Sequence, residues 1–191
     1  MGVPVAYMPY FSHPDGTIKR KSGFLTPDAG FKSNLGAFVR SRYCWDTAPD
    51  KDATVGLMAM TEQAPMLTGE WRQRWGNAEL EMSGGATYAG RTDSVGEMDV
   101  EKGDEARGHI TAEGLWDMSK KWRSGVNINW ASDDQYMRQY DITGDSVLEN
   151  EVYAERFSGR DYAAGRFLTF QDVRVNNQRV DQPQILPEIT A

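Results

Sequence analysis

One stretch of the sequence constrains the fold more than any other: residues 121–131, KWRSGVNINWA, alternate between apolar and polar side chains. One side carries Trp122, Ser124, Val126, Ile128 and Trp130, and the other carries Arg123, Gly125, Asn127 and Asn129. A period of two residues is typical of a β-strand with one apolar and one polar face. A single strand of this kind is most often half-buried in a soluble sheet, so its meaning depends on whether the pattern repeats.

The pattern repeats along the chain between short turns. Strands are predicted at residues 34–45, 53–61, 69–75, 79–89, 107–118, 121–131, 147–157 and 161–173. Tight connections such as Gly76-Asn77 predict antiparallel neighbours. A further Pro-bounded approach to a strand, QPQILPEI, follows near the end of the sequence.

The length and composition of these strands favour a membrane. Strands of roughly nine to twelve residues exceed the ~5–6 residues usual in globular sheets. Their apolar rows are rich in Gly and Ala and end in aromatic residues, and Trp122 and Trp130 lie about 26 Å apart at roughly 3.3 Å per residue. That distance is close to the apolar band of an outer-membrane barrel with its aromatic girdles. We predict an all-β fold, an antiparallel transmembrane β-barrel segment of about eight strands that does not complete a barrel.

Two segments lack the alternation and are predicted to be long loops, residues 90–106 and 133–145. No stretch has the period of a helix, so no helix is predicted. Counting the predicted strands places both loops on the same side of the sheet as residues 11–27.

The beginning of the chain is organised differently. Pro4 and Pro9 confine the apolar residues 1–10 to an edge or terminal strand, which we predict to be the last strand of an upstream domain. Residues 11–33 are rich in turn formers and are predicted to be a hinge or linker before a barrel part at 34–191. The densest positive run, Lys19, Arg20 and Lys21, either steers an anionic substrate or is a solvated part of the hinge.

Composition excludes several classes of function. A net charge of -7 and a pI near 4.9 argue against binding to nucleic acid, which needs a basic face. The apolar runs are far shorter than the ~20 residues that a membrane helix needs. A membrane barrel is still compatible with the low mean hydropathy, because its strands alternate apolar and polar residues. Cys44 is the single cysteine and forms no internal disulfide, and two histidines beside it argue against a zinc site.

Candidate catalytic groups are better explained as parts of a polar face. Glu149, Glu151 and Glu155 share one side of a predicted strand, and paired carboxylates carry glycosidase chemistry. Residues two apart nevertheless form a row that Arg123 and Arg166 of neighbouring strands can screen. His109 lacks a nearby Ser or Cys partner, and the aspartates of 133–145 lack the spacing of a calcium loop. We therefore predict no catalytic residue, no metal site and no cofactor.

Five segments carry a resemblance to a known family. They are PVAYMPYFSHPDGTIKRKSGFLTPDAG, YCWDTAPDKDATVGLMAMT, ASDDQYMRQYD, GRDYAAGRF and QPQILPEI. Together they resemble the lipopolysaccharide-assembly outer-membrane protein family LptD, also called OstA or organic solvent tolerance protein. The stretch from Pro4 to Thr61 is the most specific, and the match covers nearly the whole chain. Members of the family join a periplasmic jelly-roll domain to a very large barrel, so the chain is expected to be a middle fragment.

The resemblance implies function, partners and location. The chain is expected to take part in lipopolysaccharide transport at the bacterial outer membrane, without catalysing a reaction. Expected partners are lipopolysaccharide, outer-membrane lipid, the lipoprotein LptE that plugs the barrel and the bridge protein LptA that docks on the jelly roll. With residues 11–27 in the periplasm, the strand count leaves the long loops there too, against the short periplasmic turns usual in such barrels.

The resemblance also implies a lateral gate. Pro27 matches the first of two family prolines that weaken the seam, whereas Arg42 stands at the position of the second and Cys44 replaces a usual tyrosine. Other expected gate or hinge residues are Asn34, Leu35 and Phe38, with the basic run at 19–21 steering lipopolysaccharide. The strand at 34–45 is expected to have one unpaired edge and to pair only with 53–61.

Two alternatives remain open. One is a complete eight-stranded outer-membrane barrel, with an enzyme using the glutamate row; its usual terminal aromatic residue is replaced here by the ending LPEITA. The other is a soluble β-barrel that binds an apolar ligand. A soluble barrel needs its apolar residues inside, so the direction of Trp116, Trp122 and Trp130 separates it from the membrane interpretation.

Overall fold

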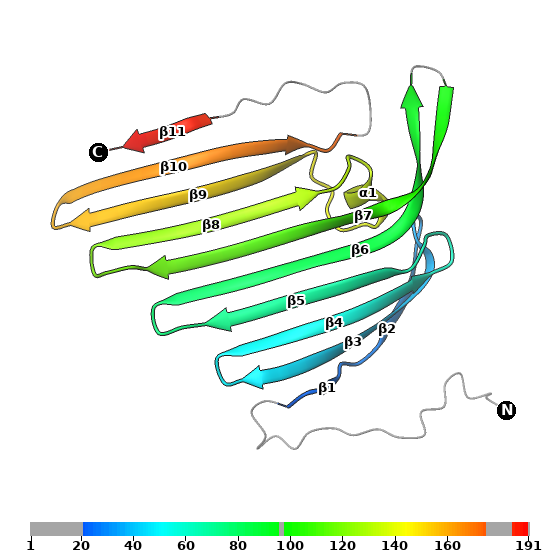
Figure 1. The fold of residues 1–191 in the computed structure, drawn as a ribbon, viewed down its shortest axis with the longest axis horizontal. Helices are drawn as coiled ribbons and strands as arrows, with labels where there is room; N and C mark the ends of the chain where they lie inside the picture. The colour runs from blue at the N-terminus through cyan, green and yellow to red at the C-terminus, as the bar shows by residue number, and fades with distance from the viewer. Residues whose placement is uncertain (1–20, 96–97, 175–184, 191) are drawn as a thin grey trace.

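The computed structural model describes residues 21–95, 98–174 and 185–190, which form one antiparallel sheet (Figure 1). Its strands are β1 (Gly23–Phe24), β2 (Asp28–Lys32), β3 (Gly36–Ala48), β4 (Lys51–Met60), β5 (Met66–Arg74), β6 (Ala78–Val95), β7 (Met98–Asp117), β8 (Trp122–Ala131), β9 (Val147–Ser158), β10 (Asp161–Asp172) and β11 (Ile185–Thr190). From β3 to β11 each strand pairs with the next in sequence, and β1 and β2 both pair with β3.

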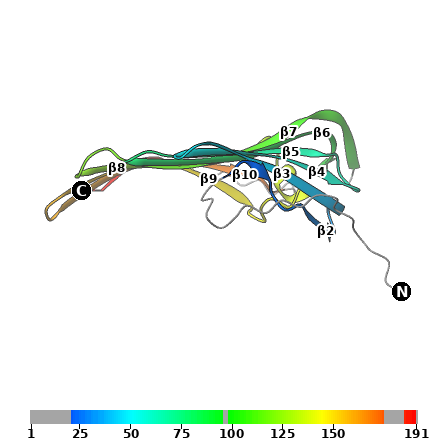
Figure 2. The same cartoon turned by 90° about the horizontal axis from the view of Figure 1, so that it is seen from below.

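The sheet is open and bends toward one side, which makes that side concave (Figure 2). The predicted all-β antiparallel fold is confirmed, and the eight predicted strands correspond to β3 to β10. The predicted upstream strand at 1–10 lies outside the described residues. The hinge at 11–33 stays a prediction as a domain boundary, although residues 23–24 and 28–32 of it form β1 and β2.

The predicted loop at 90–106 is wrong, because β6 and β7 continue through it. Their pairing extends past Ala89↔Glu105 to Val95↔Met98, with one register shift between Ala89 and Arg91. The sequence there carries charged and polar residues at consecutive positions, so no apolar row marks the strands. Backbone hydrogen bonds between neighbouring strands suffice to extend a hairpin without such a row. The extension bends away from the rest of the sheet (Figures 1 and 2).

The second predicted loop contains a helix that the sequence analysis did not predict, α1 (Tyr136–Gln139). Four residues are too few to show a helical period, which explains the miss. We call residues 132–146 the α1 loop. None of the described helical residues forms a helix long and apolar enough to cross a membrane.

The buried core lies at one end of the sheet, under the α1 loop. It consists of Leu35, Met58, Met66, Ala131, Tyr136, Met137, Tyr140, Leu148 and Val173. These residues come from the α1 loop and from strands on both sides of it, so the loop folds back over the sheet instead of extending away from it.

The expected free edge of the strand at 34–45 is also wrong. β2 pairs with β3 from Asp28↔Arg40 to Lys32↔Gly36, and β1 adds the pair Phe24↔Tyr43. The chain reverses at Gly36, whose φ of 69° lies in the left-handed region that favours glycine. The segment before β3 therefore covers the edge of β3.

This extra crossing resolves the conflict over loop sides. The α1 loop, the paired residues Val95 and Met98, and the turns at 33–35 and 61–65 lie at one end of the strands. The turns at 49–50, 75–77, 118–121 and 159–160 lie at the opposite end. The chain enters β1 at that opposite end, where Gly23 pairs with Cys44 near the end of β3. The prediction omitted the crossing that β1 and β2 make before β3, and the long connections lie away from the end at which residues 21–23 enter.

Two glycines give a matched test of the β2–β3 reversal. Both Gly36 and Gly159 have positive φ, but a Cβ on Gly36 would overlap Thr61 Oγ1, whereas a Cβ on Gly159 meets nothing within 4 Å. Each alanine substitution should cost about 1 kcal/mol for the backbone alone, and Gly36→Ala should cost about 1–3 kcal/mol more for the clash. The measurement is the free energy of unfolding in detergent micelles. Equal losses for the two variants would contradict the proposed role of Gly36.

Candidate functional site

One face of the sheet is a continuous apolar surface. Register partners place Trp45, Ala53, Trp71, Met82, Ala112 and Ile128 in one row across six strands. The neighbouring row is Tyr43, Val55, Gly69, Gly84, Ile110 and Trp130. Large side chains here are exposed, with Trp45 at 61% and Val55 at 60%. A contiguous exposed apolar surface of this kind marks a contact with membrane or with another protein.

The tryptophans that separate the alternatives lie on this exposed face. Trp116, Trp122 and Trp130 are each more than two fifths exposed. The α1 loop packs on the other side of the sheet, against His109 and Arg107, which alternate with the apolar row of β7. The expected direction of the tryptophan rows agrees with this arrangement, and a soluble barrel with these rings inside receives no support from it.

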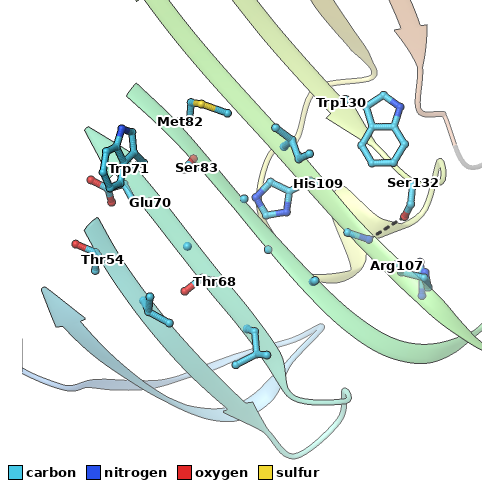
Figure 3. A pocket seen from close by; sticks show the side chains of 18 of the residues that line it. Thr54, Thr68, Glu70, Trp71, Met82, Ser83, Arg107, His109, Trp130 and Ser132 are labelled. Atoms are coloured by element: carbon cyan, nitrogen blue, oxygen red, sulfur yellow. Dashed lines mark hydrogen bonds between the residues drawn. The ribbon is translucent and has the colours of Figure 1, made fainter. Parts of the chain in front are cut away.

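A shallow hollow of about 800 Å³ lies in the apolar face. Figure 3 shows Trp71 and Trp130 on its two sides, with Met82 between the strands that carry them. Gly69 and Gly84 are among its lining residues, and neither has a side chain to fill the space.

The concave face is polar. The row Asp46, Asp52, Arg72, Glu81, Glu113, Asn127 and Glu151 crosses seven strands. Arg166 lies 3.9 Å from Glu151, and Tyr162 donates a 2.6 Å hydrogen bond to Glu155. Glu149 is exposed. Glu151 and Glu155 lie on the concave face, opposite Asn127 and Arg123 in the register, and Arg166 screens Glu151 as expected.

Arg123 was expected to screen the glutamates of β9, but its partner is a different carboxylate. It is opposite Glu155 in the register of β8 and β9, but its Nε donates a 2.8 Å hydrogen bond to Asp117. The described residues contain no group of three or more His, Cys, Asp or Glu that could hold a metal ion. The carboxylates of this face are thus dispersed among polar neighbours.

The expected gate residues fall into two groups. Pro27 and Arg42 lie at an irregularity between β1 and β2, where residues 25–27 oppose only Arg42 and Ser41. Leu25 N donates to Arg42 O at 2.9 Å before the ladder is interrupted. Pro27 is exposed and has no N–H to donate, as is typical of proline at a bulge or an edge.

The second group lies at the other end of the first strands, next to the α1 loop. Asn34 donates a 3.2 Å hydrogen bond to Arg138 O, and Leu35 is 1% exposed in the core. Phe38 is half-buried and packs against that core. Lys21 is exposed, whereas Lys19 and Arg20 lie outside the described residues.

A buried ion pair that the sequence analysis missed anchors the α1 loop. Arg107 Nε and Nη2 each donate a 2.8 Å hydrogen bond to Asp133, and the two side chains are 1% and 3% exposed. Asp133 Oδ1 also accepts from the backbone N–H groups of Gln135 and Tyr136, which starts α1. Loss of one partner would leave a buried charge, which typically costs about 3–5 kcal/mol.

The electrostatics of this anchor favour an ionised Asp133. Burial by itself raises the pKa of the Asp133 carboxyl, but hydrogen bonds from Arg107 and Ser132 outweigh it, and the pKa lies below its usual value. Burial also raises the pKa of Tyr136, so its hydroxyl stays protonated. That hydroxyl lies 3.1 Å from Met66 Sδ and 3.4 Å from His109 Nδ1.

A family model described as LPS transport system D, LptD, matches residues 105–191. An LPS-assembly protein LptD from Yersinia enterocolitica is 32% identical over 195 residues, which cover 96% of this chain. Those from Nitrosococcus oceani and Pseudoalteromonas translucida are 30% and 28% identical and cover 88% and 100% of it.

The chain belongs to the LptD family. It spans between a fifth and a quarter of the length of these three relatives, namely 24%, 22% and 24%. The predicted family membership is therefore confirmed. In this LptD chain the apolar face, the polar concave face and the interrupted edge at Pro27 together form the candidate site.

The Asp133 carboxylate should make docking of the α1 loop depend on pH. Because its folded pKa is lowered, its contribution to stability is complete above the ordinary value of 3.8 and is lost as the pH falls through the folded value. A fluorophore at Gly144→Cys, with Cys44→Ser, should lose anisotropy only below about pH 3.8. Asp145→Asn should leave that transition unchanged. Release of the loop above pH 5, or an unchanged transition in Asp133→Asn, would contradict the assignment.

Proposed function

We propose that this chain forms part of the wall and lateral gate of an outer-membrane barrel that inserts lipopolysaccharide into the outer leaflet. The observation that carries the proposal is the exposed apolar face, backed by a polar concave face, in a chain of the LptD family. The substrate, lipopolysaccharide, is proposed because the relatives are named LPS-assembly proteins. No catalytic step is part of the proposal.

The two faces fit the two environments of a barrel in the outer membrane. The apolar rows, with tryptophans near their ends, meet outer-membrane lipid, and the polar rows line a hydrated interior. Lipopolysaccharide joins acyl chains to phosphorylated sugars, so it needs both environments at once. A wall that separates them requires a seam through which the molecule can leave sideways.

The first strands supply such a seam. β1 has two residues, β2 begins after Pro27, and the ladder against β3 is interrupted between them. Pro27 has no N–H and withholds one ladder bond from whatever strand closes the barrel on that edge. Arg42 retains a donor at the position of the second family proline, which favours a stronger pairing there.

Further roles, for residues 1–33 and for the partners LptA and LptE, are proposed by analogy with the family. Residues 1–10 are the end of a periplasmic jelly roll on which LptA docks, and 11–33 connect it to the barrel. LptE occupies the polar interior, next to the row that contains Glu151. The basic run at 19–21, of which Lys21 is exposed, steers the phosphorylated sugars toward the seam.

The gate is tested by substitutions at the two proline positions in the natural protein expressed at full length. Pro27→Ala should reduce export of lipopolysaccharide about fivefold, the effect of one added hydrogen bond of ~1 kcal/mol. Arg42→Pro should raise export or leave it unchanged. Export is compared at equal protein levels in the outer membrane.

Photoreactive groups at Thr26 and Phe31 should form crosslinks with lipopolysaccharide, and one at Asn77, in a turn far along the sheet, should not. If neither substitution changes export and the crosslinks are absent, the gate does not lie at these strands.

A further inference from the structure

A continuous chain of hydrogen bonds connects the α1 loop to the first strands. Arg107 Nη1 donates to Gln139 Oε1 at 2.7 Å, and Gln139 Nε2 donates to Gln63 Oε1 at 2.6 Å. Gln63 Nε2 donates to Asn34 O at 3.0 Å, and Asn34 Nδ2 returns to Arg138 O at 3.2 Å. Through Gln139 and Arg138 of α1, these bonds join four elements that are distant in the sequence: β7, α1, the β4–β5 turn and the β2–β3 turn.

An ion pair and apolar packing also hold the β2–β3 turn to the α1 loop. Lys32, the last residue of β2, forms an ion pair with Asp141 of the α1 loop. Beneath it, Leu35 is buried in the core with Met137 of α1. Three kinds of contact thus fasten the Lys32 end of β2 to the α1 loop, and the buried Arg107–Asp133 pair fastens the loop to β7.

The other end of the first strands is held differently. The contacts of residues 22–27 go to β3: Ser22 Oγ accepts from Asp46 N at 2.9 Å, and Phe24 packs edge-to-face on Tyr43. Leu25 N bonds to Arg42 O before Pro27 interrupts the ladder. Phe24 is 78% exposed, so its packing is at the surface. Surface contacts of this kind open more readily than buried ones.

We propose that the α1 loop is a latch, which holds the Lys32 end of the first strands to the concave side of the sheet and leaves the Pro27 end free to move. Asn34, Gln63 and Gln139 are its positioning residues. The latch itself follows from the contacts; its use in releasing lipopolysaccharide rests on the proposed function. A seam held in this way opens from the end that carries the short turns, and the α1 loop sets how far the opening extends.

Hydrogen–deuterium exchange tests the latch in the full-length protein in detergent micelles. Asn34→Ala removes the bond to Arg138 O, and Gln139→Ala removes both the bond from Arg107 and the bond to Gln63. Each variant thus loses one bond that reaches the first strands or the β4–β5 turn, and each should speed amide exchange in residues 28–37 about fivefold, the usual effect of one hydrogen bond. Exchange in residues 22–27 should not change. Both substituted side chains lie at the surface or half-buried, so the fold is retained.

Asn77→Ala is the matched control, because Asn77 Nδ2 makes a comparable 3.1 Å bond to Asp117 O at the opposite end of the sheet. It should leave exchange in residues 28–37 unchanged. Gln139→Glu, which retains an acceptor for Arg107 but loses the donor to Gln63, should reproduce Gln139→Ala. Unchanged exchange in 28–37, or an equal rise in 22–27, overturns the latch.

A second readout separates the latch from the proposed function. Photocrosslinking to lipopolysaccharide, expected at Thr26 and Phe31 without this substitution, should extend to Ser33 when Gln139→Ala releases the latch. Faster exchange without a crosslink at any of these positions would retain the latch and reject the gate. A Thr26 crosslink with unchanged exchange would retain the gate and reject the latch.

Discussion

The rest of the structure depends on the register of eight long antiparallel strands, β3 to β10. Because side chains alternate along each strand, a shift of one residue in any pairing would send that strand's apolar side chains to the polar face. The observed register instead keeps Trp45, Trp71 and Ile128 in one row across six strands. Short turns between consecutive strands fix these pairs, so local sequence determines a surface that extends across the sheet.

Because the apolar face is exposed, it does not form a core, and the buried core of the fold lies elsewhere. A soluble sheet buries its apolar side under a second layer, whereas this one leaves residues such as Trp45 and Val55 more than half exposed. Among the described residues, the core lies on the concave side and at one end, where the α1 loop covers Met58 and Met66. Membrane lipid takes the place of a second layer in the proposed function.

Prediction from sequence succeeded where period and turn chemistry carry the information. The alternation around Trp122 and Trp130 predicted the strand, its two faces and the side occupied by the tryptophans. β1 and β2 were missed because Pro27 lies between them and because the alternation of Ala29 and Phe31 extends over only five residues. The Arg107–Asp133 pair joins residues 26 apart in the sequence, and no local pattern indicates which of several charged residues will meet. The α1 loop and its contacts with Asn34 therefore required the three-dimensional structure.

The most direct test of the account asks which face of β8 meets lipid. Nitroxide labels are placed one at a time at residues 125–131 of the full-length protein, with Cys44→Ser, and the protein is reconstituted in lipid bilayers. If the apolar face meets lipid, collision with dissolved oxygen, which concentrates in lipid, should peak at Val126, Ile128 and Trp130. Collision with a water-soluble nickel complex should peak at Asn127 and Asn129. The opposite alternation, or equal accessibility at all positions, would contradict a membrane-facing apolar surface.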